Sequence, residues 1–534
     1  MNTLIHDSIF EAARRTPDAA ALAYGTRRCS YADLAGLVAS VALLLRGQGL
    51  APGTRVAVYM EKRIENVAAM FGAAAAGCVF VPVNPLLKPE QVAYILADCN
   101  VRLLATTADR LASLAPALAA CPDLETVLLA ETDAHGAPGT ALRTLDWNAV
   151  TACAAGAFDP TAARPIDADM AAILYTSGST GAPKGVVLSH RNLVAGAASV
   201  AGYLDLCASD RILSVLPLSF DYGLSQLTTA FLRGASVVLM NYLFPKDIVA
   251  MVASERITGL AAVPPLWNAL ARLEWPAGCS LRFITNSGGA MPPVTVEALR
   301  GRLPSTQIFL MYGLTEAFRS TYLPPSELER RPGSMGKAIP NAEVLVVRPD
   351  GSLCADDEPG ELVHRGALVA MGYWNDPERT AQRFRPAPGR EAGLPLPELA
   401  VWSGDTVRRD SEGYLYFIGR SDEMIKVSGY RISPTEIESV VQATGLVLEA
   451  AAFGVDDGQL GQAIALVAQV PDPDAFDPAA LLAECRRRLP AYMVPAHVRL
   501  QGDSLPRNPN GKIDRKLLRQ TFDTEAQTEA QARA

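Results

Sequence analysis

Hydrophobic and polar positions along the first three hundred or so residues alternate between two periods. Apolar residues recur at helical spacing in Ile9–Ala13, Tyr31–Gln48 and Pro89–Ala97, and short β-rich runs such as Arg55–Tyr59 and Val101–Ala105 lie between them. Parallel strands buried between covering helices produce this rhythm. The pattern therefore predicts an α/β fold, and it continues through Arg211–Leu216, Ser236–Leu239, Gly259–Val263 and Leu281–Thr285.

The rhythm changes twice in the second half of the chain. From Glu343, short strands alternate with turns, which predicts a small β-rich subdomain. Its strands are expected at Glu343–Arg348, Glu361–Arg365, Val401–Ser403 and Tyr414–Phe417. Beyond Arg420 a new pattern of helix, strand, strand and helix begins, at Pro434–Thr444, Leu448–Val455, Gln462–Val470 and Pro478–Leu489.

These patterns together predict two domains. We expect a large N-terminal domain over residues 1–420, made of parallel α/β subdomains plus the β-rich subdomain. We expect a small, mobile α+β C-terminal domain over residues 421–534, which is an ordinary domain size. Two segments lack periodicity: Thr132–Asp167 is expected to be a surface insertion, and Phe522–Ala534 a frayed tail.

The most apolar stretch, Val67–Val83, is interrupted by Gly72, Gly77 and Pro82. It is shorter than the roughly 20 residues that span a bilayer, so it predicts a buried helix that leads into a buried strand. Met1–Arg15 lacks a basic segment followed by an apolar run. We therefore expect a soluble, cytoplasmic protein without a transmembrane segment.

Composition narrows the range of functions. The chain of 534 residues carries 48 basic and 56 acidic residues, a net charge of −8, so it has no general attraction for nucleic acid or anionic membranes. Any phosphate must be bound by a local arrangement of donors. The 9 cysteines are dispersed without a CxxC pair, which argues against a disulfide framework and against a zinc site.

A candidate phosphate-binding segment is Tyr175–Gly185, with the sequence YTSGSTGAPKG. Its glycines let backbone N–H groups converge on an anion, its hydroxyl residues add donors and Lys184 adds a cation, a combination that suits a polyphosphate. Pro183 stands where the GxxxxGK[ST] motif requires glycine, so this is a different kind of phosphate loop. A flexible linker is the alternative, but linkers are rarely bracketed by buried strands.

This segment resembles the signature loop of the adenylate-forming superfamily, which includes acyl-CoA synthetases, carrier-protein adenylation domains and luciferases. Five further motifs follow in that superfamily's order: Met311–Glu316, Trp402–Asp405, Gly419–Lys426, Gly429–Glu438 and Pro506–Asp514. The resemblance covers nearly the whole chain. It implies that a carboxylate attacks the α-phosphate of ATP with Mg²⁺ present, giving an acyl-adenylate, and that a thiol then displaces AMP. The thiol is CoA or the phosphopantetheine of a carrier protein.

The resemblance also implies roles for individual residues. Catalytic roles fall to Lys184, Thr315, Glu316 and Lys512, with Glu316 as the Mg²⁺ partner and Lys512 on a Gly/Asn/Pro-rich loop that reaches the site from the C-terminal domain. The hinge is Asp422. The expected nucleotide and thiol contacts are Thr176, Ser177, Gly178, Ser179, Thr180, Gly181, Gly289, Tyr312, Gly313, Asp405, Arg420 and Gly429.

The substrate acid is less clear from the sequence. By the same alignment the acid pocket is lined by Asp221, Tyr222, Ser225, Ala262, Ser287, Met311, Arg319 and Ser320. Asp221 resembles the aspartate that binds the α-ammonium of amino acids in adenylation domains, and Arg319 could hold a second carboxylate. Alternatively, Asp221 and Arg319 pair with each other and leave an apolar acyl site elsewhere.

Whole segments look most like acyl-CoA ligases associated with the exosortase A (PEP-CTERM) system. The likeness rests on Arg63–Glu65, Val81–Pro89, Asn286–Met291 and Phe318–Pro325. The leading hypothesis is an ATP- and Mg²⁺-dependent CoA ligase for a carboxylic acid. The alternatives are an amino-acid adenylating enzyme that loads an acyl carrier protein, and a non-catalytic nucleotide-binding regulator on the same fold. A serine acyl hydrolase lacks support because the chain has no GxSxG motif.

Overall fold

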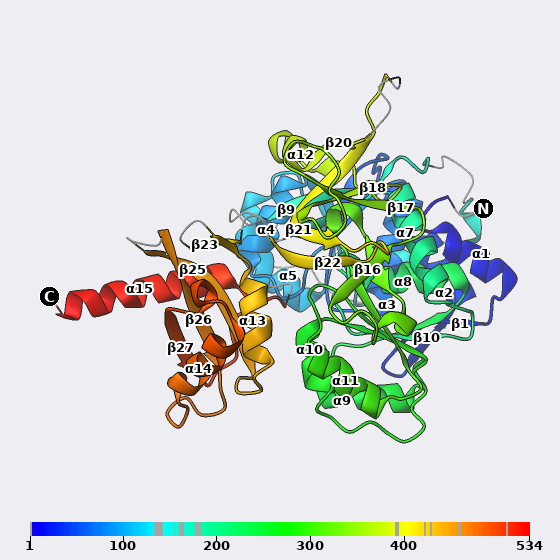
Figure 1. Ribbon diagram of the computed structural model, residues 1–534. Helices are drawn as coiled ribbons and strands as arrows, with labels where there is room; N and C mark the ends of the chain where they lie inside the picture. Colours follow the sequence, from blue (N-terminus) through cyan, green and yellow to red (C-terminus); the bar gives the residue numbers. More distant parts are fainter. Residues whose placement is uncertain are drawn as a thin grey trace.

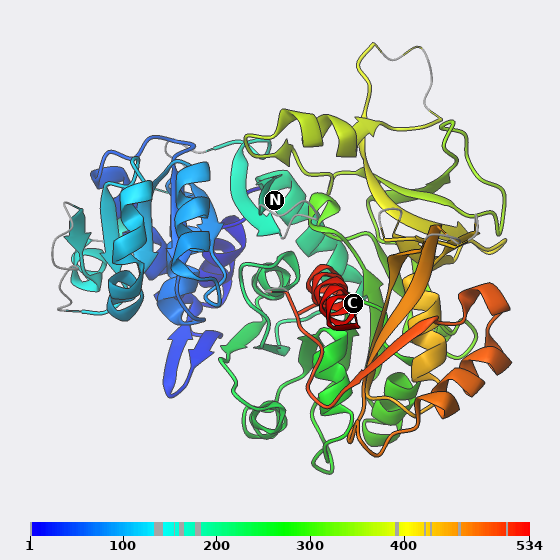
Figure 2. The same ribbon diagram turned by 90° about the vertical axis from the view of Figure 1, so that its left-hand side faces the viewer.

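The computed structural model describes residues 3–132, 142–153, 155–159, 165–176, 183–389, 393, 395–420, 423–427, 430–457, 461–508 and 511–533. These residues form three sheets with helices packed around them (Figure 1). Two sheets belong to the part of the chain before residue 421, and the third belongs to the part after it. Figure 1 shows the C-terminal segments, orange to red, gathered on one side of the molecule, and in Figure 2 that side faces the viewer.

The first sheet has the strand order β19-β9-β8-β4-β3-β5-β6-β7, in which β19 is Gly372–Tyr373 and β9 is Lys184–Ser189. Its parallel centre comprises β3 (Arg55–Tyr59), β4 (Val79–Pro82), β5 (Val101–Thr106), β6 (Thr126–Leu129) and β8 (Met170–Thr176). The predicted buried helix and strand are confirmed, because every residue of α3 (Ile64–Ala75) and of β4 is buried. The helices α4 (Pro89–Asp98) and α5 (Ala108–Leu114) follow β4 and β5 in the chain.

The described part of the segment Thr132–Asp167, where a surface insertion was expected, contains a strand and a helix. Its β7 (Arg143–Leu145) adds a parallel edge strand to β6, and α6 (Trp147–Thr151) buries Trp147 and Val150 against the core. The short length of both elements explains why periodicity did not reveal them, because three to five residues are too few to establish a period.

The second sheet begins with parallel strands and continues into antiparallel ones. The parallel part comprises β10 (Arg211–Ser214), β11 (Ser236–Leu239), β12 (Gly259–Ala262), β13 (Phe283–Asn286) and β14 (Gln307–Tyr312). The hairpin of β1 (Ala20–Tyr24) and β2 (Arg27–Ser30) extends it beyond β11. Its surrounding helices are α1 (Asp7–Arg15), α2 (Tyr31–Gly47), α7 (His190–Tyr203), α8 (Asp221–Arg233), α9 (Pro245–Ser254), α10 (Pro264–Leu270) and α11 (Pro293–Arg302).

The antiparallel part is the predicted β-rich subdomain. It comprises β15 (Thr321–Leu323), β16 (Ser334–Ala338), β17 (Ala342–Val347), β18 (Gly360–Gly366), β20 (Phe384–Pro386), β21 (Leu399–Arg409) and β22 (Leu415–Arg420), with α12 (Pro377–Arg383) beside it. The sequence predicted a strand over Val401–Ser403 that ends before Asp405, and this end was wrong. β21 runs on to Arg409, because β18 pairs with it on one edge and β22 on the other, which keeps the chain extended past Gly404.

The C-terminal unit has its own sheet and its own core. Strands β23 (Ile425–Val427), β24 (Tyr430–Ile432), β25 (Glu449–Asp457), β26 (Gly461–Gln469) and β27 (His497–Gln501) pack with α13 (Pro434–Gln442) and α14 (Pro478–Arg488). Two apolar clusters consist only of residues from Ile425 onward. The expected boundary and the hinge residue Asp422 fall on residues 421–422, outside the described residues.

The expected frayed tail is a helix instead. α15 (Arg515–Arg533) includes the described residues of this tail, and Leu518 and Phe522 pack in the cluster that contains Phe453. The composition that suggested fraying, rich in Ala, Gln and Glu, also consists of strong helix formers. Among the described residues, no helix is both long and apolar enough to cross a membrane. All nine cysteines are free thiols.

Candidate active site

The phosphate loop joins the two strands of a hairpin. Thr176, the last residue of β8, pairs in register with Lys184, the first residue of β9 (Lys184–Ser189). Of the predicted loop contacts, Ser177, Gly178, Ser179, Thr180 and Gly181 lie outside the described residues. The Thr176 hydroxyl is buried without a hydrogen-bond partner in the described part of the chain. It is therefore a donor available to an anion at the base of the loop.

Lys184 and Glu316 form a buried ion pair beside the hairpin. Lys184 Nζ lies 2.9 Å from Glu316 Oε1, and the Tyr373 hydroxyl accepts from Lys184 at 2.7 Å and donates to Glu316 at 2.5 Å. Burial raises the pKa of Glu316, but the Lys184 charge and the bonds from Tyr373 and Lys184 outweigh it and lower the pKa to about 2. Glu316 is therefore a carboxylate at physiological pH.

An ionised Glu316 with Lys184 beside it has the chemistry of a metal and phosphate site. Mg²⁺ is commonly held by one or two carboxylates together with substrate phosphates. In the described residues, no group of three or more His, Cys, Asp or Glu side chains is placed so that it could hold a metal ion by itself. An ion on Glu316 would therefore need further oxygen ligands from a phosphate or water, which agrees with this mode of binding. Thr315, the neighbour of Glu316, begins the same short helical turn, η3 (Thr315–Ala317).

Asp405 is the centre of a second cluster. The Tyr312 hydroxyl donates to Asp405 Oδ2 at 2.5 Å, and Arg420 Nη1 lies 3.0 Å from Oδ1. Asp405 and Arg420 are register partners on β21 and β22, so the sheet itself fixes this pair. The Oδ1 atom is buried and, beyond its ion pair with Arg420, accepts no hydrogen bond from the described residues. That acceptor fits the hydroxyl groups of a ribose.

The charges around Asp405 come from both parts of the chain. Burial raises the pKa of Asp405, and the charges of Arg420, Lys512 and Arg383 and the bond from Tyr312 partly offset this rise. Lys512 is exposed, and its loop is shaped by two bonds with Asn508, from the Asn508 N–H to the Lys512 carbonyl and from the Lys512 N–H to Asn508 Oδ1. The C-terminal loop thus places a lysine within electrostatic reach of the Asp405 cluster. Gly429 lies outside the described residues.

The residues predicted to contact the acid surround the first turn of α8. Arg319 Nη1 lies 2.9 Å from Asp221 Oδ2, and the Arg319 guanidinium lies 4.7 Å from the centre of the Tyr222 ring. The internal pairing that the sequence left open is therefore present. The Tyr222 hydroxyl is engaged with Thr285 Oγ1 at 2.5 Å, and the Ser225 hydroxyl is buried without a partner among the described residues.

The other predicted contacts sit at the carboxyl ends of neighbouring strands. Ala262 ends β12, Ser287 follows β13, and Met311 lies near the end of β14, where the Tyr203 hydroxyl donates to its sulfur at 2.9 Å. Ser320 is fully buried and bonded to His364 Nδ1 at 2.9 Å. Gly289 follows β13, with its carbonyl accepting from Asn286, and Gly313 follows β14 with its Cα facing Arg319.

Several residues of the site were not found from the sequence. Tyr373 and Arg383 act on Glu316, Thr285 binds Tyr222 and His364 binds Ser320. None lies in the motifs that carried the resemblance, and Tyr373 follows Glu316 by 57 residues. No local pattern of residue types could have identified them.

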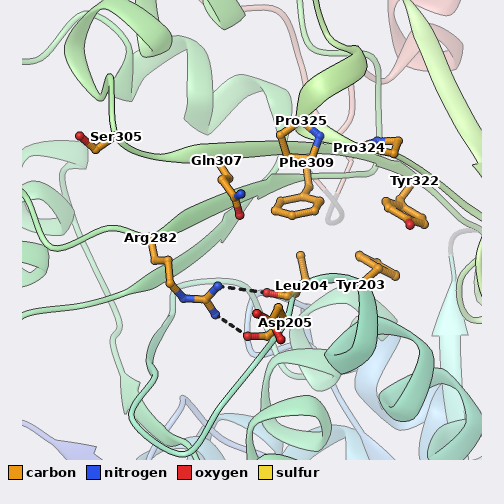
Figure 3. Close-up of a pocket in the computed structure, with 10 residues that line it drawn as sticks. All are labelled: Tyr203, Leu204, Asp205, Arg282, Ser305, Gln307, Phe309, Tyr322, Pro324 and Pro325. Atoms are coloured by element: carbon orange, nitrogen blue, oxygen red, sulfur yellow. Dashed lines mark hydrogen bonds between the residues drawn. The ribbon is translucent and has the colours of Figure 1, made fainter.

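A separate cavity of about 500 Å³ opens at the opposite end of the strands of the second sheet (Figure 3). Arg282 precedes β13 and Gln307 begins β14, so the cavity lies at the amino ends of these strands. Arg282 already pairs with Asp210 at 2.7 Å and donates to the Leu204 and Asp205 carbonyls. Ligands of open parallel sheets bind at the carboxyl ends of the strands, where Asp221, Tyr312 and Glu316 are found, so this cavity is not the candidate site.

Comparison with known proteins gives a consistent family. The chain matches the AMP-binding enzyme family over residues 9–374 and the AMP-binding enzyme C-terminal domain over residues 436–512. Tyrocidine synthase 3 of Brevibacillus parabrevis is 31% identical over 99% of this chain, which is 8% of that protein. Surfactin synthase subunit 2 of Bacillus subtilis (strain 168) is 30% identical over 96% of this chain, which is 14% of that protein. The chain thus spans a small fraction of these relatives.

Solved structures match over nearly the full length of this chain and of their own chains. ATP-bound MatB from Rhodopseudomonas palustris has a TM-score of 0.84 at 25% identity and covers 98% of this chain and 99% of its own. The o-succinylbenzoate CoA synthetase MenE of Bacillus subtilis, in complex with its acyl-adenylate intermediate, has a TM-score of 0.79 at 25% identity, covering 96% and 97%. The anthranilate CoA ligase AuaEII, with a TM-score of 0.85 at 24% identity, covers 98% and 99% and shares the fold.

Proposed function

Because this chain belongs to the AMP-binding enzyme family, and is thus an adenylate-forming enzyme, we propose that it is a CoA ligase for a carboxylic acid. It joins the acid to the α-phosphate of ATP, which releases pyrophosphate, and then transfers the acyl group to the thiol of CoA, which releases AMP. The observation that carries this proposal is the pair of polar clusters formed by Lys184, Glu316 and Tyr373 and by Tyr312, Asp405 and Arg420, which supply a carboxylate for a metal, a cation for phosphate and an acceptor for ribose.

Each cluster serves one part of the ATP molecule in this proposal. Asp405 accepts the ribose hydroxyls, Tyr312 lies beside the adenine, and Thr176 with Lys184 donates to the phosphates. A Mg²⁺ ion, when bound, reduces the negative charge that repels an incoming carboxylate. Glu316 is the residue that would hold it, and Lys184 would then turn from Glu316 to a phosphate oxygen.

Lys512 assists the first reaction. A carboxylate that approaches the α-phosphate adds negative charge between the two groups, and a cation placed there lowers the energy of the transition state. Its exposed loop can enter and leave the site with the C-terminal unit. We propose that this unit, hinged at Asp422, turns after adenylation so that Gly429 approaches the thiol arm.

The alternative is adenylation of an amino acid and its transfer to the phosphopantetheine of a carrier protein. The curated relatives favour it, since they are named as synthases of tyrocidine and surfactin and not as CoA ligases. The Asp221–Arg319 pair disfavours it, because Asp221 already has a cationic partner and does not need a substrate ammonium group. The CoA ligases among the solved structures favour free CoA as the acceptor.

ATP–pyrophosphate exchange over panels of fatty, aryl and amino acids tests the proposal. We expect exchange with non-amino acids, followed by CoA-dependent release of AMP. Exchange confined to amino acids, with transfer only to a carrier protein, would establish the alternative. If ATP binds but no acid supports exchange, the protein is a nucleotide-binding regulator and the proposal is wrong.

Substitution of Lys512 separates the two half-reactions. We expect Lys512→Ala to slow acyl-adenylate formation by roughly 100-fold or more, the loss typical of removing one transition-state donor. Thioester formation from preformed acyl-adenylate should be nearly unchanged. Lys516→Ala is the matched control, because Lys516 is an exposed lysine on the adjacent first turn of α15. Equal losses in both half-reactions would contradict the role given to Lys512.

A further inference from the structure

Arg319 is a buried cation whose hydrogen-bonding capacity is only partly used. Its side chain is 2% exposed, and Nη1 donates to Asp221 Oδ2 at 2.9 Å. Nε and Nη2 are buried and have no partner among the described residues. A buried donor without a partner is costly, and charged donors are more costly than neutral ones. The two unused nitrogens therefore call for an oxygen acceptor that is not part of the described chain.

The surroundings of Arg319 restrict what that acceptor can belong to. The guanidinium lies 4.7 Å from the centre of the Tyr222 ring and 5.8 Å from that of Phe318, so aromatic side chains flank the unused donors. Ser225 is one helical turn after Asp221 on α8, on the same face, and its buried hydroxyl also lacks a partner in the described residues. The site thus combines aromatic surfaces with two sets of unused polar groups.

The charge of the site argues against a cationic substrate group. Asp221 and Arg319 neutralise each other, so a substrate ammonium group would bring a second positive charge next to a buried guanidinium. It would also have to compete with Arg319 for Asp221. An aliphatic chain, in turn, would leave the Arg319 donors desolvated and unpaired.

We propose that the substrate acid carries, besides its reacting carboxylate, an oxygen acceptor that binds the Nε–Nη2 edge of Arg319. Arg319 and Asp221 are then specificity-determining residues that select oxygen-bearing acids over alkyl acids and amino acids. This inference rests on the proposed function, and it names the substrate class of the same site. The acceptor is a hydroxyl, a carbonyl or a second carboxylate, since one edge of a guanidinium can bind any of them.

The test uses acids matched in carbon skeleton. Pentanoate, levulinate, glutarate and norvaline share one chain length and differ in the added group. Benzoate, salicylate, phthalate and anthranilate share one aromatic ring and differ in the substituent next to the carboxylate. We expect kcat/KM in ATP–pyrophosphate exchange to be roughly tenfold to hundredfold higher for the oxygen-bearing members than for the parent acid of at least one series. Norvaline should be no better than pentanoate.

Variants assign this preference to the ion pair. Arg319→Met should bring the ratio of kcat/KM for the oxygen-bearing acid to kcat/KM for the parent acid close to one. Arg302→Met, at an exposed arginine of α11, should leave this ratio unchanged. Asp221→Asn leaves the guanidinium without its counter-charge, so kcat/KM for glutarate should rise relative to kcat/KM for levulinate. The size of that rise shows whether the acceptor on the substrate is a carboxylate or a neutral group. If either single variant fails to fold by thermal melting, the double variant Asp221→Asn with Arg319→Met removes both charges together.

Calorimetric binding of the same acids, with a non-hydrolysable ATP analogue present, separates this inference from the proposed function. If the oxygen-bearing acids bind more tightly than their parent acids but none supports ATP–pyrophosphate exchange, the inference about Arg319 is supported and the proposed ligase function is wrong. Three outcomes would overturn the inference: parent acids that match oxygen-bearing ones, a preference for norvaline that Asp221→Asn abolishes, or no binding of any acid.

Discussion

At the residue scale, buried polar groups of this protein depend on partners that are distant in sequence. His364, on β18, is completely buried and is bonded through Nδ1 to the Ser320 hydroxyl at 2.9 Å. Burial lowers its pKa from 6.5 to about 4, so the imidazole is neutral in the folded state at physiological pH. The unfolded chain takes up this proton at a higher pH than the folded protein does.

This difference predicts a loss of stability on acidification. Between pH 6.5 and pH 4 the unfolded state binds the His364 proton and the folded state does not, so the free energy of unfolding falls as the pH falls. The full contribution is about 3 kcal/mol. His364→Gln should reduce this slope in melting temperatures measured against pH, whereas His497→Gln, at an exposed position, should not. An unchanged slope in His364→Gln would contradict the assignment.

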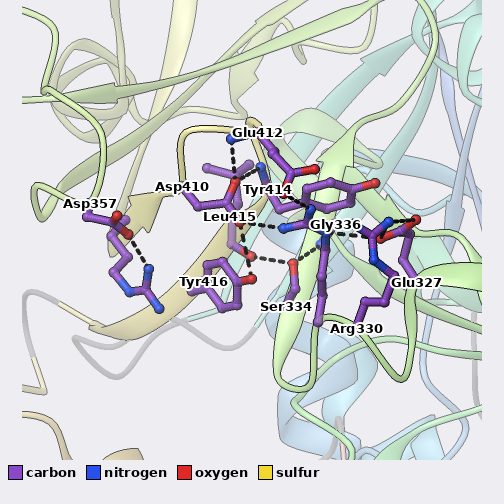
Figure 4. Close-up of polar contacts among 12 residues, drawn as sticks. Glu327, Arg330, Ser334, Gly336, Asp357, Asp410, Glu412, Tyr414, Leu415 and Tyr416 are labelled. Atoms are coloured by element: carbon purple, nitrogen blue, oxygen red, sulfur yellow. Dashed lines mark hydrogen bonds and ion pairs between the residues drawn. The ribbon is translucent and has the colours of Figure 1, made fainter.

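At the scale of elements, β16 depends on a close approach to β15. Gly336 has a φ of +84°, and a Cβ at this position would lie 1.8 Å from the Tyr322 carbonyl oxygen. The neighbouring Ser334 hydroxyl donates to the Leu415 carbonyl at 2.9 Å and accepts from the Gly336 N–H (Figure 4). Nearby, Arg331 pairs with Glu327 and Asp410, which ties the turn before β16 to β21 and β22. This junction joins the parallel sheet that carries Tyr312 to the strands that carry Asp405.

We therefore expect Gly336→Ala to be strongly destabilising. The left-handed backbone costs an alanine about 1 kcal/mol, and the clash with backbone adds about 1–3 kcal/mol. Gly333→Ala is the matched control, because Gly333 has a φ of +79° but open space where its Cβ would be. The difference between the two melting temperatures measures the clash alone. Equal shifts in both variants would show that the close approach contributes nothing to stability.

At the scale of the whole molecule, the candidate site is assembled from both units. Thr435 of the C-terminal unit donates to the Ile418 carbonyl at 3.3 Å, and the charge of Lys512 acts on Asp405. This is the arrangement in which we propose that Lys512 assists adenylation. Within the C-terminal unit, Arg515 pairs with Glu438 at 2.7 Å and with Glu423 at 3.2 Å, so these contacts can be retained when the unit moves.

Movement of this unit is a prediction that distance measurements can test. Labels at exposed Leu243 and Leu446 report on the two units, and non-natural amino acids are suitable because the exposed native thiol of Cys207 would compete for cysteine reagents. We expect one distance distribution with ATP and a different one with a stable acyl-adenylate analogue plus CoA. Thioester formation with an unchanged distance would rule out the proposed turn.

The sequence by itself determined the family, the order of the motifs and most elements. The phosphate loop, the Met311–Glu316 motif and the Pro506–Asp514 motif are continuous in the chain, so residue type and spacing were sufficient to recognise them. Periodicity predicted α3 and the parallel strands because these elements are long or uniformly apolar. Periodicity failed for β7 and α6, which are short. For the tail, a polar composition rich in Ala, Gln and Glu predicted fraying where the structure has a helix.

Only the tertiary structure decided which charges meet. Tyr373 reaches Lys184 across 189 residues, and Arg319 reaches Asp221 across 98. The sequence could name Asp221 and Arg319 but left their pairing open, because a pair in a low-dielectric interior depends on ångström-scale geometry that spacing along the chain does not specify. The same holds for Lys512, whose effect on Asp405 exists only because two separately folded units face each other.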